Sequence, residues 1–298
     1  MRILLTGSAG FLGAAIGRAI RATFPGAEVS GADRRATPST DLLDPAQVAA
    51  LVDRAKPTHV IHAAGGHGQL DVRQQFELHA VATEHLLKAL RAQAGAPVFI
   101  NVGSAAQYGP QRERRPLGED ARDEPAGPYG VSKVAAELLV RANANSGALR
   151  AVYLRVFNPI GPEQQGGLLV PTIVRQLAQA QAGRAEVVLA NLDDERDYLD
   201  ADDVGRAVVA CLGSERALGQ QLNVCSGSPT SVRDIALGLA RAAGLEATLS
   251  VIPGPPREAS YSCGDPEKLQ RLAGFRPTIP LALSLERICA AAGLTRRQ

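Results

Sequence analysis

Residues 2–20 read RILLTGSAGFLGAAIGRAI and carry the strongest indication of the fold. A short apolar run is followed at once by three glycines spaced three apart, and then by an alanine-rich segment of helical character. The glycines are Gly7, Gly10 and Gly13. Glycine in such a turn lets the backbone approach a pyrophosphate, and the N-terminus of the next helix offers unpaired N–H groups and the positive end of the helix dipole. The spacing is one residue longer at the front than the usual fingerprint, but its place between strand and helix predicts a dinucleotide site.

The same stretch superficially imitates a secretory signal peptide, because Arg2 precedes an apolar run. Its regularly spaced glycines argue for a strand, a turn and a helix instead. No other segment approaches the roughly 20 apolar residues that are needed to cross a bilayer. We therefore expect no membrane partner.

The composition is that of a globular protein. The chain has 298 residues, of which 45% are hydrophobic and 21% charged, and this length suffices for one large or two modest domains. Because the net charge is only +2 and no basic stripe occurs, we expect no nucleic-acid partner. The four cysteines lie far apart in the sequence, so neither a zinc site nor a disulfide scaffold is indicated, and a reducing cytoplasm fits best.

Short apolar segments alternate with helical segments through the first half of the chain. The predicted strands are Arg2 to Leu5, Glu28 to Ala32, His59 to Ala63, Val98 to Val102 and Leu149 to Val156. The predicted helices are Phe11 to Thr23, Ala46 to Ala55, Val72 to Ala94 and Tyr129 to Asn145. Buried strands separated by helices predict an α/β fold with a doubly wound parallel sheet of the Rossmann kind.

After about Phe157 the alternation loosens, and prolines and glycines interrupt it in NPIGPEQQGG and PGPPREAS. Shorter helices are predicted at Val170 to Ala182, Asp202 to Leu212, Ser231 to Ala243 and Leu281 to Ala292. We predict a smaller C-terminal substrate-binding lobe that is interleaved with the first domain. The dinucleotide-binding domain would take residues 1–158 plus about 191–225, and the lobe about 159–190 plus 226–298.

The second predicted strand ends at a carboxylate that bears on cofactor choice. Asp33, 20 residues past Gly13, is placed to accept hydrogen bonds from the adenine-ribose hydroxyls, which favours NAD. Arg34 and Arg35 follow at once, and either guanidinium would neutralise a 2′-phosphate. The sequence leaves NAD and NADP open.

Four motifs together resemble those of the extended short-chain dehydrogenase/reductase family, which contains nucleotide-sugar epimerases, dehydratases and reductases. They are Thr6-Gly7-x-x-Gly10-x-x-Gly13, His62-Ala63-Ala64-Gly65, Ser104 and Tyr129-x-x-x-Lys133. Later blocks resemble the branch that contains GDP-4-keto-6-deoxy-mannose reductase and related sugar 4-ketoreductases. These blocks read LRVFNPIGP, RDYLDADDV, NVCSGSPTSVRDI and DPEKLQRLAGFRP. The likeness extends over nearly the whole chain.

The resemblance implies a catalytic set of three residues. Tyr129 would act as general acid or base toward a carbonyl or alcohol. Lys133 lies one helical turn away on the same face, so its charge is expected to lower the pKa of Tyr129 from about 10 toward working pH, and it would also hold the nicotinamide ribose. Ser104, after the fourth strand, would hydrogen-bond the substrate oxygen.

The resemblance also implies the binding residues. Those for an NAD(P) cofactor are Gly7, Ala9, Gly10, Phe11, Leu12, Gly13, Asp33, Arg34, Asp41, Leu42, Ala63, Ala64, Gly65, Tyr129 and Lys133. Those for the substrate are Ser104, Ala105, Asn158, Arg196 and Arg257. The two arginines would hold the diphosphate of a sugar nucleotide, for which a guanidinium fork is well suited.

His79 stands where the family block usually has an asparagine. It is either a member of a proton relay or a satisfied structural histidine. Neither His79 nor the group of His59, His62 and His67 has convincing metal-ligand spacing, so no metal site is expected.

The implied reaction is NAD(P)H-dependent reduction of a ketone, at C4 of a nucleotide-linked keto-deoxy sugar. A nucleotide-sugar 4-epimerase is the nearest alternative, since epimerases use the same groups. A ketoreductase acting on a polyketide or another natural-product ketone, and a dinucleotide-sensing regulator, stay open as more distant ones. Dehydratases of the family resemble a pattern with an acidic pair beside the central serine or threonine. In this chain Ala105 and Ala106 follow Ser104, so water elimination is disfavoured.

Family dimers pair the two helices that flank the active site with their counterparts in a second subunit. In this chain those helices are Val72 to Ala94 and Tyr129 to Asn145, and both carry apolar residues around more than one face. A homodimer is therefore expected.

Overall fold

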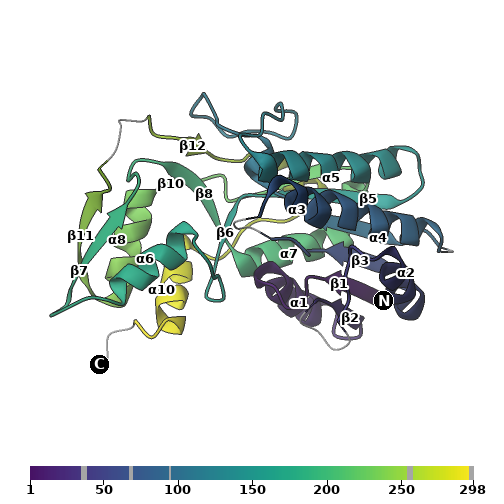
Figure 1. The fold of residues 1–298 in the computed structure, drawn as a ribbon, viewed down its shortest axis with the longest axis horizontal. Coiled ribbons are helices and arrows are strands. Elements are labelled where there is room, and N and C mark those ends of the chain that lie inside the picture. The colour runs from purple at the N-terminus through teal and green to yellow at the C-terminus, as the bar shows by residue number, and fades with distance from the viewer. Residues whose placement is uncertain (35–38, 67–69, 94, 254–257, 295–298) are drawn as a thin grey trace.

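A six-stranded parallel sheet forms the centre of the larger part of the molecule (Figure 1). The structure, a computed structural model, describes residues 1–34, 39–66, 70–93, 95–253 and 258–294. The strand order is β2-β1-β3-β4-β5-β9 and every neighbouring pair is parallel. The strands are β1 (Arg2–Thr6), β2 (Glu28–Ala32), β3 (His59–His62), β4 (Val98–Val102), β5 (Arg150–Val156) and β9 (Gln221–Val224).

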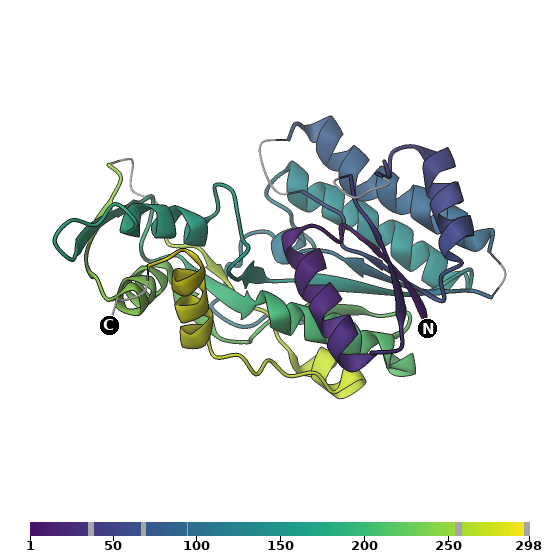
Figure 2. The ribbon, with the colours of Figure 1, turned by 90° about the horizontal axis from the view of Figure 1, so that it is seen from below.

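Helices cover both faces of this sheet, which confirms the doubly wound α/β prediction (Figure 2). On one face lie α1 (Phe11–Thr23) and α7 (Ala201–Leu212). On the other lie α2 (Pro45–Ala55), α4 (Ala82–Arg91) and α5 (Pro128–Asn145). Strand alternation explains the two layers, since Ile3 and Leu5 enter one core cluster and Leu4 enters the other.

The prediction of one continuous α-helix from Val72 to Ala94 is wrong between Glu77 and Val81. The structure has α3 (Val72–Phe76), a π-helical turn η1 (Glu77–Val81) and α4 in series, and Ala94 lies outside the described residues. A capping box between Asp71 and Gln74 starts α3. A π turn holds one extra residue, and such turns occur frequently at functional sites. This one presents His79 to the start of α5.

A smaller lobe packs beyond the carboxyl ends of the parallel strands. Its helices are α6 (Leu169–Leu177), α8 (Val232–Ala243) and α10 (Leu281–Ala291), which enclose one core cluster. The strands outside the six-stranded sheet, which the sequence did not predict, are β6 (Asn158–Ile160), β7 (Arg184–Leu189), β8 (Glu195–Asp200), β10 (Pro229–Ser231), β11 (Glu246–Val251) and β12 (Tyr261–Ser262). The residue bounds proposed for the two lobes stay a prediction.

The predicted helix from Val170 to Ala182 ends early, at Leu177, and the segment after it turns into β7. A further helix, α9 (Glu267–Ala273), brings the chain back against β9 in the larger sheet. Across the described parts of the chain, no helix has the length and apolar character to span a membrane.

Candidate active site

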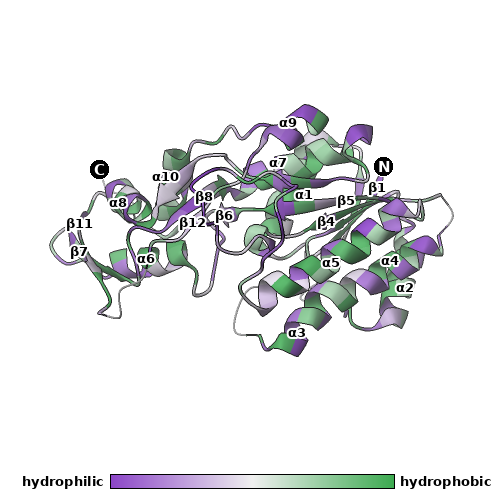
Figure 3. Ribbon diagram, turned by 90° about the horizontal axis from the view of Figure 1, so that it is seen from above, coloured by the Kyte–Doolittle hydropathy of each residue, from purple (hydrophilic) through white to green (hydrophobic). Residues whose placement is uncertain are grey.

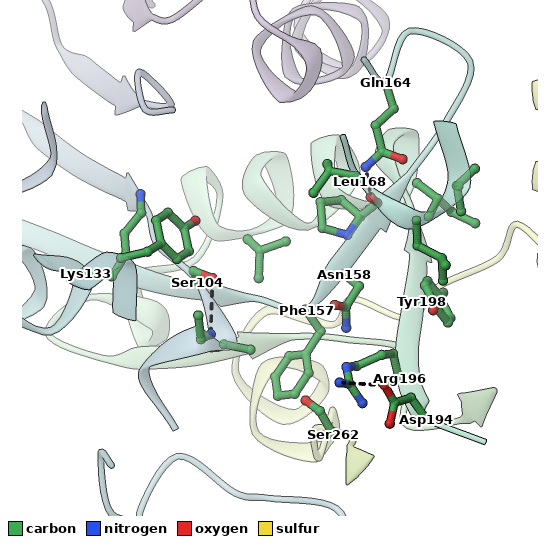
Figure 4. Close-up of a pocket in the computed structure, with 18 of the residues that line it drawn as sticks. Ser104, Lys133, Phe157, Asn158, Gln164, Leu168, Asp194, Arg196, Tyr198 and Ser262 are labelled. Atoms are coloured by element: carbon green, nitrogen blue, oxygen red, sulfur yellow. Dashed lines mark hydrogen bonds and ion pairs between the residues drawn. The ribbon is translucent and has the colours of Figure 1, made fainter. Parts of the chain in front are cut away.

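A cavity of about 860 Å³ opens between the carboxyl ends of the parallel strands and the smaller lobe (Figure 4). In doubly wound folds this is where ligands bind. Many of the residues singled out in the sequence line it, from both parts of the molecule. They are Gly10, Phe11, Leu12, Ala63, Gly65, Ser104, Ala105, Tyr129, Lys133, Asn158 and Arg196.

The glycine turn at one end of the cavity fits a pyrophosphate. Gly7 has a φ of +70°, and a Cβ there would lie 2.6 Å from the backbone of Ala64. A Cβ on Gly13 would lie only 1.9 Å from the carbonyl oxygen of Gly7. Gly10 caps α1 without a side-chain hydrogen bond, and the first turn of α1 carries no acidic residue. The first turn of α1 therefore lines the cavity beside a backbone that only glycine permits, and a helix start of this kind favours an anion.

Other predicted cofactor residues lie in the glycine turn, after β2 and before α2. Ala9 is in the turn itself. Asp33 and Arg34 follow β2 directly, and the backbone carbonyl of Asp33 accepts a hydrogen bond from the Thr40 N–H at 3.4 Å. Asp41 and Leu42 lie in the segment before α2, where Asp41 accepts from the Leu43 N–H at 3.0 Å. Arg35 lies outside the described residues.

Ser104, Tyr129 and Lys133 come together in the middle of the cavity wall. Ser104 follows β4 and caps a 3-10 turn, η2 (Ala105–Gln107), by accepting the Ala106 N–H at 3.2 Å. Pro128 begins α5, which places Tyr129 and Lys133 one turn apart. The Lys133 Nζ lies 5.8 Å from the centroid of the Tyr129 ring and 3.5 Å from the carbonyl oxygen of Val102.

The electrostatics of this set differ from the sequence prediction that Lys133 lowers the pKa of Tyr129. Burial raises the pKa of Tyr129, and a hydrogen bond with Ser104 offsets part of that rise. Burial also lowers the pKa of Lys133 to about 8, because its ammonium group is taken out of water. Burial, and not the charge of Lys133, is therefore the dominant influence on the pKa of Tyr129.

The pKa of Lys133 gives a pH prediction. Between pH 8 and about 10 the unfolded chain holds a proton on this lysine that the folded chain has released, so the group's contribution to the free energy of unfolding rises with pH. We expect urea denaturation of the cofactor-free protein to show wild type gaining stability relative to Lys133→Met between pH 8 and 10. A difference that stays constant across that range would contradict the lowered pKa.

His79 lies directly beside this set. Its Nδ1 is 2.9 Å from the Ser132 hydroxyl, its Nε2 is 3.5 Å from the Gly66 N–H, and its ring meets that of Tyr129 edge-on at 5.3 Å between centroids. The Ser132 hydroxyl donates to the Tyr129 carbonyl at 2.8 Å. His79 thus has hydrogen-bond partners on both sides, and a relay role stays a prediction.

His62 does not respond to pH near neutrality. It is buried under the glycine turn, 2.7 Å from the Thr6 hydroxyl, and burial followed by the charge of Lys133 lowers its pKa to about 3. It therefore stays neutral across the working range of an enzyme.

Arg196 and Asn158 lie at the far end of the cavity (Figure 4). The Arg196 Nη1 donates to the carbonyls of Glu195 and Ser260 at 2.8 and 2.9 Å, and its Nη2 donates to the Ser260 hydroxyl at 2.6 Å. Asn158 donates to the Asp197 carbonyl at 2.9 Å. Arg257 lies outside the described residues.

The sequence analysis missed several residues at this end of the cavity. Asp194 lies 3.9 Å from Arg196 and accepts from the N–H and hydroxyl of Ser260 at 2.8 and 2.9 Å. Leu168 and Tyr198 add apolar wall. A carboxylate two residues before Arg196 was visible in the sequence, but its pairing with Ser260, 66 residues away, was not.

A parallel sheet whose glycine turn and catalytic-type side chains open into one cavity defines a dinucleotide-binding enzyme of the Rossmann class. Comparison of the chain with known proteins supports this class and identifies the family within it. The chain belongs to the NAD dependent epimerase/dehydratase family, whose model matches residues 3–225. It is therefore an NAD(P)-dependent enzyme of the extended short-chain dehydrogenase/reductase type, and the family resemblance is confirmed.

Two bacterial relatives share 31% identity with the chain. GDP-6-deoxy-D-mannose reductase of Pseudomonas aeruginosa matches over 300 residues, covering 96% of this chain and 95% of the relative. A dTDP-6-deoxy-L-talose 4-dehydrogenase (NAD(P)(+)) of Kitasatospora kifunensis matches over 271 residues, covering 85% and 83%. UDP-glucose 4-epimerase of Mycolicibacterium smegmatis is 26% identical and covers 95% of each chain.

Solved structures give the same answer for the fold. RMD from Pseudomonas aeruginosa, complexed with NADPH, superposes with a TM-score of 0.86 at 28% identity and covers 98% of this chain and 99% of its own. The UDP-glucose 4-epimerase of Thermus thermophilus, complexed with NAD, has a TM-score of 0.85 at 28% identity with the same coverage. The two structures hold different nicotinamide cofactors.

Proposed function

We propose that this protein reduces a ketone at C4 of a nucleotide-linked keto-deoxy sugar with NADH or NADPH. The observation that carries the proposal is one continuous cavity, with the glycine turn at one end, Ser104, Tyr129 and Lys133 in the middle, and Arg196 at the other end. A sugar nucleotide needs both a reacting end and an anion-binding end. Two relatives whose names state a 6-deoxy sugar as substrate support the same class.

The bound nicotinamide would supply hydride to the carbonyl carbon. The Tyr129 hydroxyl would give its proton to the carbonyl oxygen, so that the ketone becomes an alcohol and a phenolate is left behind. Ser104 would hydrogen-bond the same oxygen and stabilise its developing charge. The Lys133 ammonium would stabilise the phenolate until it regains a proton from solvent.

A 4-epimerase is the second candidate, because UDP-glucose 4-epimerases occur among both the relatives and the solved structures. A panel of nucleotide sugars separates the two. A reductase consumes one NAD(P)H per ketone, whereas an epimerase interconverts two sugars without net consumption. Reduction of a ketone without phosphate would favour the natural-product alternative, and cofactor binding without turnover on any substrate would favour the regulator.

Arg196→Ala tests the diphosphate end. A guanidinium makes charge-assisted hydrogen bonds with a diphosphate that contribute about 1.5 to 3 kcal/mol, so we expect KM to rise about tenfold or more. The value of kcat should change less, because this contact is equally present in the ground and transition states. A free nucleoside diphosphate should compete with the substrate of the wild-type enzyme. Steady-state kinetics with the best sugar nucleotide measures both effects.

Arg233→Ala is the matched control, since Arg233 is an arginine of the same lobe that pairs with Asp193 on the surface at 3.2 Å. Its KM should stay at the wild-type value. If Arg196→Ala also leaves KM unchanged and nucleoside diphosphates fail to inhibit, the sugar-nucleotide assignment is wrong and the reductase assignment survives.

We propose a homodimer that pairs the helical segment made of α3, η1 and α4, together with α5, with their counterparts in a second copy. These helices carry hydrophobic segments at the edge of the molecule (Figure 3), and Val72, Val81, Val131 and Leu138 are exposed there. Val131 and Leu138 lie seven residues apart and so share one face of α5. Leu138→Glu should convert a dimer into a monomer in light scattering at micromolar concentration, while Leu283→Glu, at an exposed leucine of α10, should not. A wild-type monomer would refute the proposal.

We place the protein in the cytoplasm. All four cysteines are buried free thiols, which supports a reducing compartment. Cell fractionation that found the protein outside the cytoplasm would overturn this assignment.

A further inference from the structure

A buried polar cluster lies behind the catalytic serine, and none of the functions assigned so far uses it. It consists of Gln107, Glu137 and Arg155, which are 0%, 1% and 2% exposed. The Gln107 Nε2 donates to the Glu137 Oε2 at 2.8 Å. Arg155, on β5, donates two hydrogen bonds to the same carboxylate, from Nε to Oε2 at 2.8 Å and from Nη2 to Oε1 at 2.7 Å. Buried polar side chains with this many mutual bonds hold one geometry.

Gln107 joins two elements that carry catalytic groups. It ends η2, the short turn that Ser104 caps, and Glu137 lies on α5, one turn after Lys133 and two turns after Tyr129. The Gln107–Glu137 hydrogen bond therefore ties the serine turn to the helix that supplies the other two groups. It acts across 30 residues of sequence.

A second contact docks the same turn at the start of the same helix. Gly130 packs so close to η2 that a Cβ would lie 2.5 Å from the carbonyl oxygen of Ala106. Two separate points, one beside Tyr129 and one two turns later, thus fix the orientation of η2 against α5. Without the Gln107 bond, the turn would be held to α5 near Gly130 and to the sheet through the Tyr108 hydroxyl, which donates to Asn223 at 2.7 Å, so it could pivot between these points and carry the Ser104 hydroxyl away from Tyr129.

The Glu137 carboxylate is itself held still. Besides its two bonds to Glu137, Arg155 reaches Asp123 at 3.1 Å and stacks over the Tyr108 ring at 4.6 Å from the centroid. Arg155 on β5 of the central sheet therefore fixes the position of the Glu137 carboxylate. The hydrogen bond from Gln107 to this carboxylate, here called the clamp, in turn fixes η2 relative to β5.

We propose that Gln107 is a positioning residue for catalysis, which acts through Glu137 to hold the Ser104 hydroxyl against the Tyr129 hydroxyl. The inference rests on the function proposed for Ser104 and Tyr129. Its mechanism is geometric, because displacement of a reacting or stabilising group by about 1 Å is enough to slow a reaction by up to about 10²-fold. The glycine turn and Arg196, which are proposed to hold the cofactor and the diphosphate, lie elsewhere in the molecule and do not depend on the clamp.

Gln107→Met tests the clamp, since methionine keeps the length and volume of glutamine and lacks the N–H donor. We expect kcat to fall about tenfold or more, while KM and the dissociation constant of the cofactor stay within about twofold of wild type. A purely structural role would lower the melting temperature and leave the kcat of the folded fraction unchanged. That second result would overturn the proposal.

Asn143→Leu is the matched control. Asn143 is a buried residue near the end of α5 that is remote from Tyr129. Its side-chain oxygen accepts a hydrogen bond from Arg91 at 2.6 Å. Its loss should lower the melting temperature and leave kcat unchanged. If Asn143→Leu lowered kcat as much as Gln107→Met does, general loosening of α5 would explain both variants and the proposal would fall.

Gln107→Asn keeps the test decisive if Gln107→Met folds poorly. Asparagine retains the amide donor but is one methylene shorter, so its N–H cannot reach the Glu137 Oε2 that Gln107 reaches at 2.8 Å. The kcat of its folded fraction should also fall about tenfold or more, and a kcat at the wild-type value would refute the clamp. Tyr129→Phe separates the two proposals: if it retains full turnover the proposed function fails, whereas if it is inactive and Gln107→Met is fully active only the clamp fails.

Discussion

Tyr129→Phe should lower kcat by about 10²-fold or more and leave cofactor affinity nearly unchanged. The substitution removes one hydroxyl, which lies in the cavity in hydrogen-bond contact with Ser104 and is the proposed proton donor. The aromatic ring stays, so its edge contact with His79 at 5.3 Å and the packing of Lys133 are preserved. Stopped-flow absorbance of the nicotinamide at saturating substrate measures the rate, and fluorescence titration measures cofactor affinity.

Tyr108→Phe is the matched control for Tyr129→Phe. Tyr108 follows Ser104 by four residues, is buried and donates to Asn223 at 2.7 Å, but no lysine stands four positions after it. Its loss should lower stability and reduce kcat far less than Tyr129→Phe does. Near-normal turnover in Tyr129→Phe would show that Tyr129 is not the proton donor.

Gly13→Ala should weaken cofactor binding by about 10²-fold. The added methyl would lie 1.9 Å from the Gly7 carbonyl oxygen, and because that atom is backbone it cannot rotate away. Either the glycine turn or the start of α1 must then shift, and the N–H groups proposed to bind the pyrophosphate would shift with them. Loss of two hydrogen bonds to a charged group, each contributing about 1.5 kcal/mol, corresponds to about two orders of magnitude in the dissociation constant.

Gly205→Ala provides the control for that clash. A methyl there would lie 2.7 Å from the Ala15 carbonyl oxygen, so it also presses on α1, but on the side that packs against α7. Calorimetry should show a lower melting temperature for both variants and weaker NAD(P)H binding for Gly13→Ala alone. Unchanged affinity in folded Gly13→Ala would show that the turn is not the pyrophosphate site.

The cofactor half of the fold was predictable because its signals are local. The helix from Phe11 to Thr23 and the strands from Glu28 to Ala32 and from Val98 to Val102 have the predicted bounds, since apolar runs, glycines and helical spacing act over a few residues. The π turn at Glu77–Val81 was not predictable, because one extra residue per turn leaves the apolar pattern of a long helix almost intact. Strand β8, Glu195–Asp200, reads ERDYLD and lacks the apolar run on which strand prediction depends.

The site was predictable where motifs carry it and not where contacts between distant segments do. Ser104, Tyr129 and Lys133 lie together in the cavity as the motifs suggested. By contrast, the bond between Gln107 and Glu137 joins residues 30 positions apart, and the bonds between Arg196 and Ser260 span 64. Pairings of this length depend on the finished topology, which no short pattern in the sequence encodes.

The strand order has a consequence for how the chain folds as it leaves the ribosome. Strand β9, Gln221–Val224, forms one edge of the central sheet beside β5, although the residues between them build much of the smaller lobe. Until residue 224 has been synthesised, the almost fully buried strand β5 is an uncovered edge with unpaired backbone groups, the kind of surface that recruits other strands. Completion of the first domain therefore waits for the segment of the smaller lobe that lies between β5 and β9, whereas α8 and α10 of that lobe are synthesised later, so the two parts of the molecule mature together rather than in order of synthesis.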